Sequence, residues 1–463
     1  MHTDESPVVV VGAGPAGLAT AMSLARLGIE TILVERRAEL SSLPRATAVS
    51  LRSMELMRSW GVEDAVRAGG VDVEWRGWQS QTLATAAAGS MWPVGMPSRE
   101  QAAALSPTVP ACVPQDHLEP VLLEQLRALG ATRVHLHTEV VGVENVPGGV
   151  EVVLRDVATG DVRTVGARYL IAADGAHSRI RTSLGIAMRG PDGLAHAVMA
   201  IFRAPLWRLV GEHRYGIYSV DHADGAGTFL PAGRGDRWGY GTWVDPQDVE
   251  GYTPERFVRR IRAGAGIADL EVSIERVGAF SFAAQLADRF RAGNVFLAGD
   301  AAHRVTPRGG TGMNSAIRGG HDLGWKLGWV LRGWAGPELL DTYEAEWRPI
   351  AAHNVARSAD PDGSTRETAD ELHVDLGGRI PHVWVNSDEG RVSTLDLLGP
   401  GLTLFTGPDS GPWNAHPNGG PPVTLRPLDA VSARAIGIRD RGALLVRPDG
   451  TPAHLWTQAA TAA

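Results

Sequence analysis

A glycine-rich turn near the start of the chain limits what it can fold into more than any other feature. The run VVVV (8–11) is a continuous β-branched segment, as expected for a parallel strand buried on both faces. The turn GAGPAG (12–17) follows at once, and the small, apolar segment 18–27 after it has helical character until Gly28. A second strand, TILVE, occupies 31–35. This order of strand, tight turn, helix and strand predicts a βαβ unit.

The glycines of this turn fit the G-x-G-x-x-G pattern, which indicates dinucleotide binding when it lies between a strand and a helix, as it does here. Gly12 permits the tight turn, Gly14 lets the backbone approach a pyrophosphate, and Gly17 allows close helix–strand packing. Glu35 ends the second strand, where its carboxylate would accept hydrogen bonds from a ribose diol and repel a 2′-phosphate. We therefore expect FAD or NAD, rather than NADP, in this cradle.

A second segment with the features of a ligand-binding loop lies at 294–331. The strand-like run NVFLAGD ends at Asp300, where a carboxylate is well placed to bind polyol hydroxyls. The run PRGGTG (307–312) then brings bare backbone to the start of a long helix. The N-terminus of that helix can stabilise an anion, such as the N1–C2=O edge of a reduced flavin. Two such contacts far apart in sequence favour the longer cofactor, FAD.

The length of the chain and its strand patterns predict three domains. The chain has 463 residues, roughly three times the usual domain size of about 150. Between 196 and 244, alternating runs such as YGIYSV, GTFLPA and RWGYGTWV are separated by Gly/Asp turns, which predicts a second, antiparallel sheet. The C-terminal part combines short strands with Pro/Gly turns, consistent with a small third domain.

Composition excludes several classes of protein. The single cysteine, Cys112, cannot form an internal disulfide, a cysteine-based zinc site or an Fe–S cluster, and no metal site is predicted. A net charge of −8 and a pI near 6.0 argue against a nucleic-acid partner. No apolar run reaches the about 18 residues of a membrane span, and the N-terminus MHTDESP lacks a signal-peptide pattern. We therefore expect a cytoplasmic protein that does not bind membranes.

Four segments together resemble the class A flavoprotein aromatic hydroxylases, which have the para-hydroxybenzoate hydroxylase fold, and most of all the polyketide hydroxylases. They are GAGPAG with Glu35 and Arg36, LPRA (43–46), YLIAADGAHSRIR (169–181), and GDAAH with the later P-x-GG-x-G-x-N. The third segment resembles the family's Asp-Gly motif.

The resemblance also implies roles for individual residues and a fold for the C-terminus. Asp174 would contribute to FAD and pyridine-nucleotide contacts, and Arg45 and Gln115 match positions at which the family contacts FAD. The segment STLDLLGPGLTLFTGP (393–408) resembles the start of the thioredoxin-like C-terminal domain of that subfamily. It contains no Cys-x-x-Cys, which excludes a redox role for this domain.

The fold expected from the motifs and the resemblance is α/β (α+β overall), with three parts. A Rossmann-like FAD-binding domain would comprise 1–75, 101–187 and 280–358. An antiparallel-sheet substrate domain would comprise 76–100 and 188–279. A small thioredoxin-like domain would occupy 368–463.

Two stretches depart from the family pattern. The usual Pro-Pro of the second loop is Thr306-Pro307 here, and it is followed by Arg308, a permanent cation close to the expected flavin ring. Further on, the usual Asp-Ala-x-Asn-Leu is replaced by a run that begins Gly319-Gly320. Each glycine costs a helix roughly 1 kcal/mol relative to alanine, so we expect a kink there.

These patterns yield a set of candidate site residues. The residues expected to bind the cofactor are Gly12, Ala13, Gly14, Pro15, Ala16, Gly17, Glu35, Arg36, Arg45, Gln115, Asp174, Asp300, Pro307, Gly309, Gly310, Gly312, Met313 and Asn314. The residues proposed to support catalysis are Arg45, Pro307 and Arg308, and no catalytic base is assigned. The residues proposed to line the substrate pocket, from successive strands of the second sheet, are Tyr215, Phe229, Trp238 and Tyr240.

The function that the resemblance implies is an FAD-dependent aromatic monooxygenase of antibiotic biosynthesis. NADPH or NADH would reduce FAD, O₂ would form a flavin C4a-hydroperoxide, and its distal oxygen would pass to an electron-rich phenol, by family likeness a polyketide. One alternative is a Baeyer–Villiger oxygenation of a ketone on the same scaffold. Another is a flavin dehydrogenase or a non-catalytic flavoprotein. A monomer or a homodimer is expected.

Overall fold

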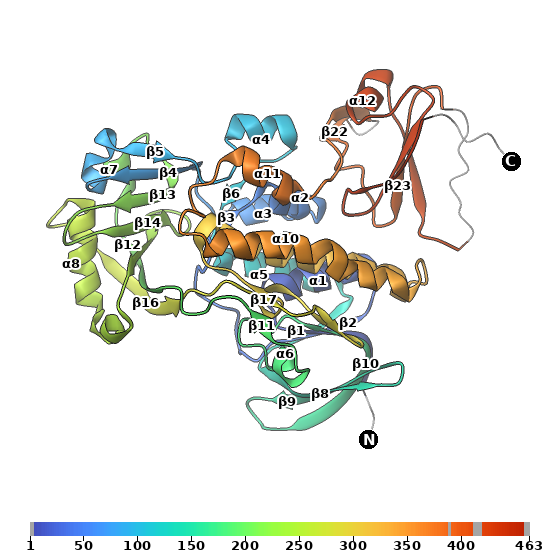
Figure 1. Ribbon diagram of the computed structural model, residues 1–463, viewed down its shortest axis with the longest axis horizontal. Helices are drawn as coiled ribbons and strands as arrows, with labels where there is room; N and C mark the ends of the chain where they lie inside the picture. Colours follow the sequence, from blue (N-terminus) through green and yellow to red (C-terminus); the bar gives the residue numbers. More distant parts are fainter. Residues whose placement is uncertain (1–3, 388–389, 411–418, 458–463) are drawn as a thin grey trace.

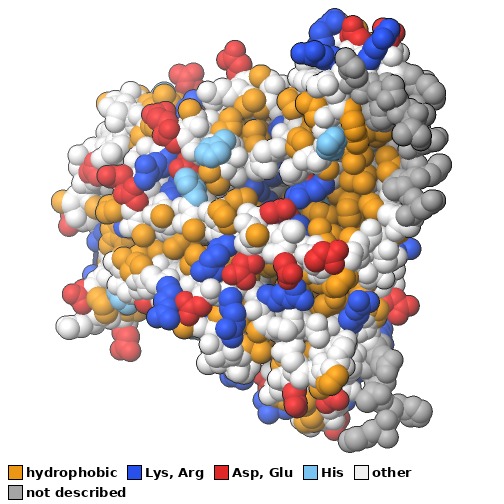
Figure 2. Space-filling model, turned by 45° about the vertical axis from the view of Figure 1, so that its right-hand side comes forward, with side chains coloured by type: hydrophobic (Ala, Val, Ile, Leu, Met, Phe, Trp, Pro, Cys, Tyr) orange, Lys and Arg blue, Asp and Glu red, His pale blue; other side chains and the backbone are white. Residues whose placement is uncertain are grey.

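The computed structural model describes residues 4–387, 390–410 and 419–457. Three units built on β-sheets share the chain, and the long helix α10 (Asp341–Ala359) crosses the middle of the molecule (Figure 1). None of the helices in the described ranges is both long and apolar enough to cross a membrane. Charged side chains of both signs are mixed over the face shown in Figure 2, and neither sign forms a continuous patch there.

The first unit is built on a largely parallel sheet, as the sequence predicts. Its main path runs β18-β19-β10-β1-β2-β7, with β1 parallel to both β10 and β2. Val8, Val9 and Val10 on β1 have no exposed surface, which explains the uninterrupted run of β-branched residues. The strands of this sheet are β1 (Asp4–Val11), β2 (Thr31–Val34), β7 (Thr132–His135), β8 (Thr138–Val146), β9 (Gly149–Asp156), β10 (Val162–Ala172), β18 (Arg291–Ala292) and β19 (Val295–Leu297).

Helices α1 (Pro15–Arg26), α5 (Gln115–Leu129) and α9 (Gly312–Leu331) pack in this unit, and α9 contradicts one expectation. It runs without a break through Gly319 and Gly320, so the predicted kink is wrong. A Cβ on Gly320 would lie 2.4 Å from the carbonyl oxygen of Ala16 on α1, and one on Gly324 would lie 2.6 Å from the Ser23 side chain. The glycines therefore let two helices approach closely; they do not bend one helix.

The second unit is a seven-stranded sheet of order β16-β12-β15-β14-β13-β4-β5, antiparallel except at the β13–β4 pair. Helix α8 (Pro254–Ala265) covers one face and contributes Phe257 and Ile261 to a separate hydrophobic core. The strands are β4 (Glu74–Ser80), β5 (Ser90–Trp92), β12 (His196–Arg203), β13 (Tyr215–Val220), β14 (Gly227–Pro231), β15 (Arg237–Trp243) and β16 (Ser273–Ser281).

The C-terminal unit contains a four-stranded sheet of order β24-β23-β25-β26, in which the β23–β24 pair is parallel and the other two pairs are antiparallel. This is the strand order expected of a thioredoxin-like core. Helix α12 (Ala430–Ala435) adds Ala433 to the core of this unit. The strands are β23 (Leu402–Thr406), β24 (Val423–Pro427), β25 (Ala443–Val446) and β26 (Pro452–Trp456).

Buried ion pairs join the C-terminal part of the chain to the first unit. Glu55, on α2 (Leu51–Ser59), accepts hydrogen bonds from Arg52 and from Arg379, at 2.7 and 2.6 Å. Burial by itself would raise the pKa of Glu55, but the two guanidinium groups hold it below its usual range. The Glu55 carboxylate is therefore ionised at neutral pH, and it joins α2 to the C-terminal segment that carries Arg379.

Lys326 on α9 is the centre of a second buried group of charges. Its ammonium has no exposed surface and contacts Asp322 at 2.8 Å and Glu346 of α10 at 2.9 Å. Glu346 in turn binds Arg447 of the C-terminal unit at 2.8 Å. Asp322, Glu346 and Asp449 approach one another closely enough to suggest a cation site. Lys326 and Arg447 already neutralise them, so the cluster is an ion-pair network between units.

Candidate functional site: a dinucleotide cradle

The turn between β1 and α1 can be built only with glycine at two positions. Gly12 has φ +104°, and a Cβ there would lie 2.3 Å from the carbonyl oxygen of Ala173. A Cβ on Gly17 would lie 1.9 Å from the carbonyl oxygen of Gly12. Gly14 caps α1 without any side-chain hydrogen bond, and Pro15 is its first residue. The N–H groups of the first turn are thus free to bind an anion.

Glu35 follows β2 and turns back onto this loop. Its Oε2 accepts a hydrogen bond from the backbone N–H of Ala13 at 3.0 Å, and its Oε1 accepts one from the N–H of Arg37, also at 3.0 Å. The neighbouring side chain of Arg36 is exposed. The carboxylate lies where a ribose diol attached to a phosphate at Gly14 would reach it.

The ends of β10 and β19 meet the same turn. The Cα of Asp174 is 3.4 Å from the position of a Cβ on Gly12, and a Cβ on Gly299 would lie 2.9 Å from the Ala16 side chain. The structure therefore brings Asp174 and Asp300 to the carboxyl ends of adjacent parallel strands, beside the glycine turn. This is the edge at which open α/β sheets bind ligands.

Asp174 retains an unused acceptor. Its Oδ2 accepts from the N–H of Ile180 at 3.4 Å, whereas Oδ1 is buried and has no hydrogen-bond partner among the residues described. Burial raises the pKa of this carboxyl group. A buried acceptor without a partner is costly, and a ligand hydroxyl would satisfy it.

Asp300 and Arg45 are oppositely charged neighbours. Both side chains are exposed, yet burial by the surrounding protein raises the pKa of Asp300, which Arg45 and Arg304 oppose. The Asp300 carboxylate is thus accessible to solvent although protein encloses most of it. A carboxylate in such a position can bind a ligand. Such a group would suit the hydroxyls of a ribityl chain.

Glu119 is a residue of the cradle that the sequence analysis missed. It follows Gln115 by one turn on α5, and Gln115 Nε2 donates to its Oε1 at 2.7 Å. The same oxygen is 4.0 Å from the position of a Cβ on Gly14. Burial raises its pKa to about 7. Helical spacing from Gln115 was the available signal, because residues at i and i+4 share one face of a helix.

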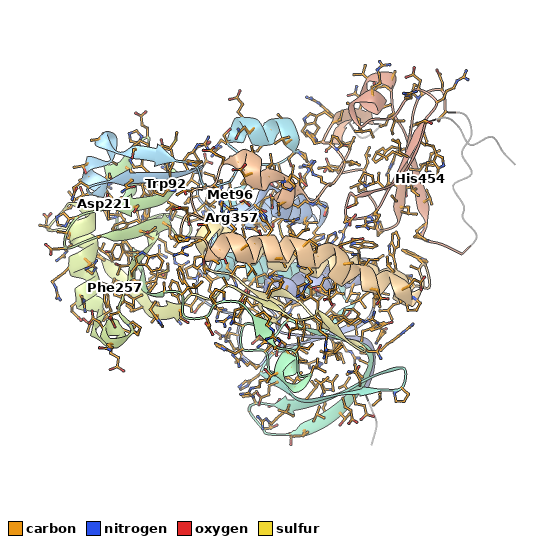
Figure 3. The ribbon with its side chains drawn as sticks, in the orientation of Figure 1. Trp92, Met96, Asp221, Phe257, Arg357 and His454 are labelled. Atoms are coloured by element: carbon orange, nitrogen blue, oxygen red, sulfur yellow. The ribbon has the colours of Figure 1, made fainter. Side chains whose placement is uncertain are left out.

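The second glycine loop is fixed by its neighbours. Gly309 and Gly310 have φ of +79° and +63°, which favour glycine. A Cβ on Gly309 would lie 2.6 Å from Arg357 Nε, and one on Gly310 would lie 3.4 Å from the Cβ of Ala48. Met96 also lies within 3.8 Å of the Cβ position of Gly310, and Figure 3 shows Met96 and Arg357 close together near the end of α10.

Arg308, which the sequence analysis places near the flavin, contacts the end of α10. Its guanidinium donates to the carbonyl oxygens of Ala359 and Asp360, each at 3.4 Å, at the C-terminal end of α10. The backbone of the loop is retained by the Thr306 hydroxyl, which accepts from the N–H of Arg308 at 3.2 Å. Pro307 precedes this turn with φ −62°. In this arrangement Arg308 binds the last carbonyl oxygens of a helix and keeps its positive charge, because neutral acceptors do not neutralise a guanidinium.

At the start of α9, Gly312 opens the helix and Met313 is buried in the core. The Asn314 side chain joins the second loop to the segment before α2. Its Nδ2 donates to the carbonyl oxygens of Ala48 and Gly310, both at 2.9 Å, and its Oδ1 accepts from the N–H of Ser50 at 2.8 Å. Both donors of the amide and one of the two acceptor positions of Oδ1 are used within the protein. The side chain therefore holds the second loop against the segment before α2.

Three of the four predicted substrate residues lie on the other face of the second sheet. Phe229, Trp238 and Tyr240 have no exposed surface and belong to the core beneath α8. Tyr215 is half-buried at the edge of that core, where its ring stacks on Trp78 at 5.0 Å. The expectation that these residues line a pocket is thus corrected, because the period of a strand places Trp238 and Tyr240 on one face together.

The alternate residues of β15 turn toward the first unit. Arg237 binds Asp116 of α5 at 2.9 Å and Glu275 at 2.9 Å. Gly239 and Gly241 share this face, and a Cβ on Gly241 would meet no atom closer than 3.5 Å. On the neighbouring strands Ile201 and Leu230 lie opposite Gly239, Met199 lies opposite Gly241, and Arg203 lies opposite Arg237. The face of the sheet toward the first unit therefore combines two arginines with aliphatic side chains around two glycines.

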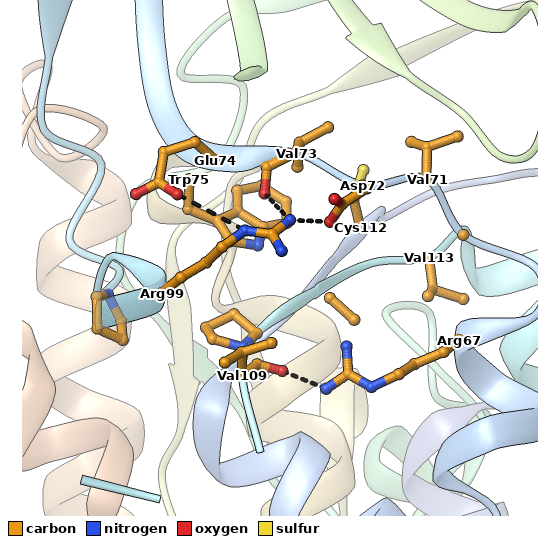
Figure 4. Close-up of a pocket in the computed structure, with 14 residues that line it drawn as sticks. Arg67, Val71, Asp72, Val73, Glu74, Trp75, Arg99, Val109, Cys112 and Val113 are labelled. Atoms are coloured by element: carbon orange, nitrogen blue, oxygen red, sulfur yellow. Dashed lines mark hydrogen bonds and ion pairs between the residues drawn. The ribbon is translucent and has the colours of Figure 1, made fainter. Parts of the chain in front are cut away.

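A cavity of about 300 Å³ opens beside this junction, between β4, α4 (Arg99–Leu105) and β6 (Ala111–Cys112). Arg99 extends across it toward Asp72 and Glu74, and Trp75 forms its back wall (Figure 4). None of the predicted substrate residues lines it. Cys112 lines it, but burial raises the pKa of its thiol to about 12, so it is not a nucleophile at neutral pH.

The cradle as a whole fits a dinucleotide. Two turns accept only glycine, an uncapped helix N-terminus adjoins them, and Asp174 holds a buried acceptor without a partner. His303, near the second loop, accepts from Trp347 Nε1 at 3.3 Å, and burial lowers its pKa to about 4. It is a neutral structural residue, not an acid or a base at neutral pH.

Replacing Asp300 with asparagine should weaken FAD binding about tenfold, because a hydrogen bond to a charged acceptor is stronger than one to a neutral acceptor. Quenching of FAD fluorescence on binding measures the effect. Asp64→Asn, on the exposed surface of α3 (Glu63–Arg67), is the matched control and should leave the affinity unchanged. Equal affinity of both variants would place the ribityl hydroxyls elsewhere.

The chain matches known sequence families over most of its length. The family described as FAD binding domain matches residues 5–358, and the family described as aromatic-ring hydroxylase, C-terminal, matches 373–463. The chain is 34% identical to tetracenomycin A2 monooxygenase-dioxygenase of Streptomyces glaucescens, over 97% of this chain and 93% of that protein. It is 35% identical to an aklavinone 12-hydroxylase of Streptomyces purpurascens, over 99% of this chain and 97% of that protein.

Solved structures resemble the whole molecule. A ternary complex of aklavinone-11 hydroxylase with FAD and aklavinone superposes with a TM-score of 0.89 at 32% identity, covering 100% of this chain and 97% of that one. The flavin-dependent monooxygenase PieE, in complex with FAD and substrate, gives a TM-score of 0.87 at 28% identity, covering 98% of this chain and 96% of that one. The likeness thus extends over all three units.

Proposed function

The chain belongs to the family of FAD-dependent aromatic-ring hydroxylases, and from this premise we propose that it hydroxylates a polycyclic phenol of polyketide type. NADPH or NADH would supply the hydride, and O₂ the oxygen atom. The observation that carries the proposal is the cradle itself, in which the carboxyl ends of four parallel strands, β1, β2, β10 and β19, converge on an uncapped helix N-terminus. Relatives that act on tetracenomycin A2 and aklavinone support the substrate class.

The residues that would hold FAD divide by the part of the cofactor that they meet. Gly12, Gly14 and the first turn of α1 would bind the pyrophosphate, and Glu35 the adenosine ribose. Asp300 would bind the ribityl hydroxyls. When bound, FAD supplies the redox chemistry, by accepting hydride from the nicotinamide and activating O₂.

The second loop and the second sheet would stabilise the reduced flavin and enclose the substrate. The backbone N–H groups of the Gly309–Asn314 segment would stabilise negative charge at the N1–C2=O edge of the flavin. Arg45 would add positive charge beside Asp300. The glycines of β15, with Ile201, Leu230 and Met199 on the neighbouring strands, would present an apolar surface to a flat substrate and exclude water around it. No residue is assigned as a base that removes the phenol proton.

A test of the proposal measures how NAD(P)H reduces the bound flavin without oxygen. Addition of the correct polycyclic phenol should accelerate the loss of flavin absorbance, and admission of O₂ should then give a hydroxylated product by mass spectrometry. A ketone that gains oxygen between two carbons would indicate the Baeyer–Villiger alternative. Flavin that NADPH and NADH both fail to reduce, with every phenol tried, would favour a dehydrogenase or a non-catalytic flavoprotein.

A further inference from the structure

Glu119 is an acidic residue in a place where an anion is expected to bind. Its side chain is 3% exposed, and its Oε1 lies 4.0 Å from the position of a Cβ on Gly14. Gln115 Nε2 donates to that oxygen at 2.7 Å, whereas Oε2 has no hydrogen-bond partner among the residues that the structure describes. The amide of Gln115 thus fixes the carboxyl group and leaves Oε2 free to bind a ligand.

The charges that face Glu119 do not stabilise it fully as an anion. Arg45 and Arg37 favour the carboxylate, while Glu35 opposes it. The first turn of α1, which packs against α5, contains no acidic side chain. On α5 itself, Asp116 binds Arg237, and His117 contacts the carbonyl oxygen of Ala65. The effect of burial on the carboxyl group is larger than the opposing effect of the two arginines, and it raises the pKa of Glu119 to about 7.

A pyrophosphate at Gly14 would change this balance further. It would place negative charge beside a carboxyl group that is already close to equally divided between the protonated acid and the carboxylate at neutral pH. A second negative charge in a buried site disfavours the carboxylate, so it favours protonation. The protonated acid has an O–H to donate, and phosphate oxygens are strong acceptors. Binding of the cofactor and uptake of a proton would then be coupled.

We propose that Glu119 is a protonated carboxylic acid in the FAD-bound protein and donates its O–H to an oxygen of the FAD pyrophosphate. The inference rests on the proposed cofactor site and assigns it a further positioning residue. The proposal predicts that the affinity for FAD decreases as pH rises. Above neutral pH the free protein must take up a proton to bind FAD, so the affinity falls as pH rises.

The experiment measures the Kd of the purified apoprotein for FAD, by fluorescence quenching, between pH 6 and pH 8. The wild-type Kd should rise about tenfold over this range, as one coupled proton requires. Glu119→Gln keeps a donor without a titrating group, so its Kd should stay flat and near the wild-type value at pH 6. Glu124→Gln, on the exposed face of the same helix, is the matched control and should keep the wild-type dependence.

A wild-type Kd that is flat with pH, or a dependence that persists in Glu119→Gln, would overturn the proposal while leaving the cofactor site intact. Failure of the wild-type protein to bind FAD at any pH would instead overturn the cofactor site itself. Infrared difference spectra of the wild-type protein give a second readout in case the variant does not fold. Addition of FAD at pH 8 should produce the carbonyl band of a protonated carboxylic acid, and its absence would contradict the proposal.

Discussion

Gly14→Val is expected to weaken FAD binding at least about a thousandfold, or about 4 kcal/mol, while the protein still folds. Gly14 has φ −82° and ψ −177°, an extended conformation that any residue adopts. A Cβ there would have a single neighbour within 4 Å, the Glu119 carboxyl oxygen. The valine methyls would therefore fill the space in front of the α1 N-terminus, where the pyrophosphate is proposed to bind. Absorbance of bound flavin after dialysis measures the loss.

Gly166→Val is the matched control for this variant. Gly166 lies on β10, where an added Cβ would meet nothing within 4 Å, and far along that strand from its cradle end. It should retain FAD with wild-type affinity. If Gly14→Val bound FAD within tenfold of the wild-type protein, the phosphates could not lie against Gly14, and the orientation proposed for the cofactor would be wrong.

Gly320→Ala is expected to lower the free energy of unfolding by about 3 kcal/mol. Its Cβ would lie 2.4 Å from the carbonyl oxygen of Ala16 and 3.0 Å from Thr20 Oγ1. The first of these atoms is backbone within a buried helix, so α1 and α9 would have to separate. Alanine favours a helix over glycine by about 1 kcal/mol, which is too little to offset that separation. Urea denaturation followed by circular dichroism measures the change.

The control for Gly320 is Gly278→Ala on β16, where an added Cβ meets nothing within 4 Å. Its unfolding free energy should stay within about 0.5 kcal/mol of the wild-type value. Equal stability of Gly320→Ala and the wild-type protein would show that the two helices can move apart freely, contrary to the close packing described.

The parts of the fold that depend on local patterns could be predicted from the sequence. The four consecutive valines and the glycine turn define β1 and the start of α1, because only a buried parallel strand and a tight turn accept those residues. Alternating runs separated by turns likewise predicted the second sheet. The family that the motifs resemble is confirmed by the matches over 5–358 and 373–463.

Features that depend on packing between distant segments could not be predicted in the same way. The kink expected at Gly319-Gly320 is wrong, because helix propensity takes no account of the approach of α1. Trp238 and Tyr240 were predicted to line the substrate pocket. The sequence does show that they share a face, but only the position of α8 determines which face is buried. The contact of Arg308 with the end of α10 was likewise not predictable, since it joins segments far apart in the chain.

Lys326 is the only lysine in the sequence, and its ammonium group is sealed between Asp322 and Glu346. An amine-acylating reagent therefore finds no exposed ε-amino group in the native fold. Acylation at this position requires α9, α10 and the segment with Arg447 to separate. The rate at which Lys326 is acylated, followed by peptide mass, would therefore report how often the C-terminal unit separates from the rest of the molecule.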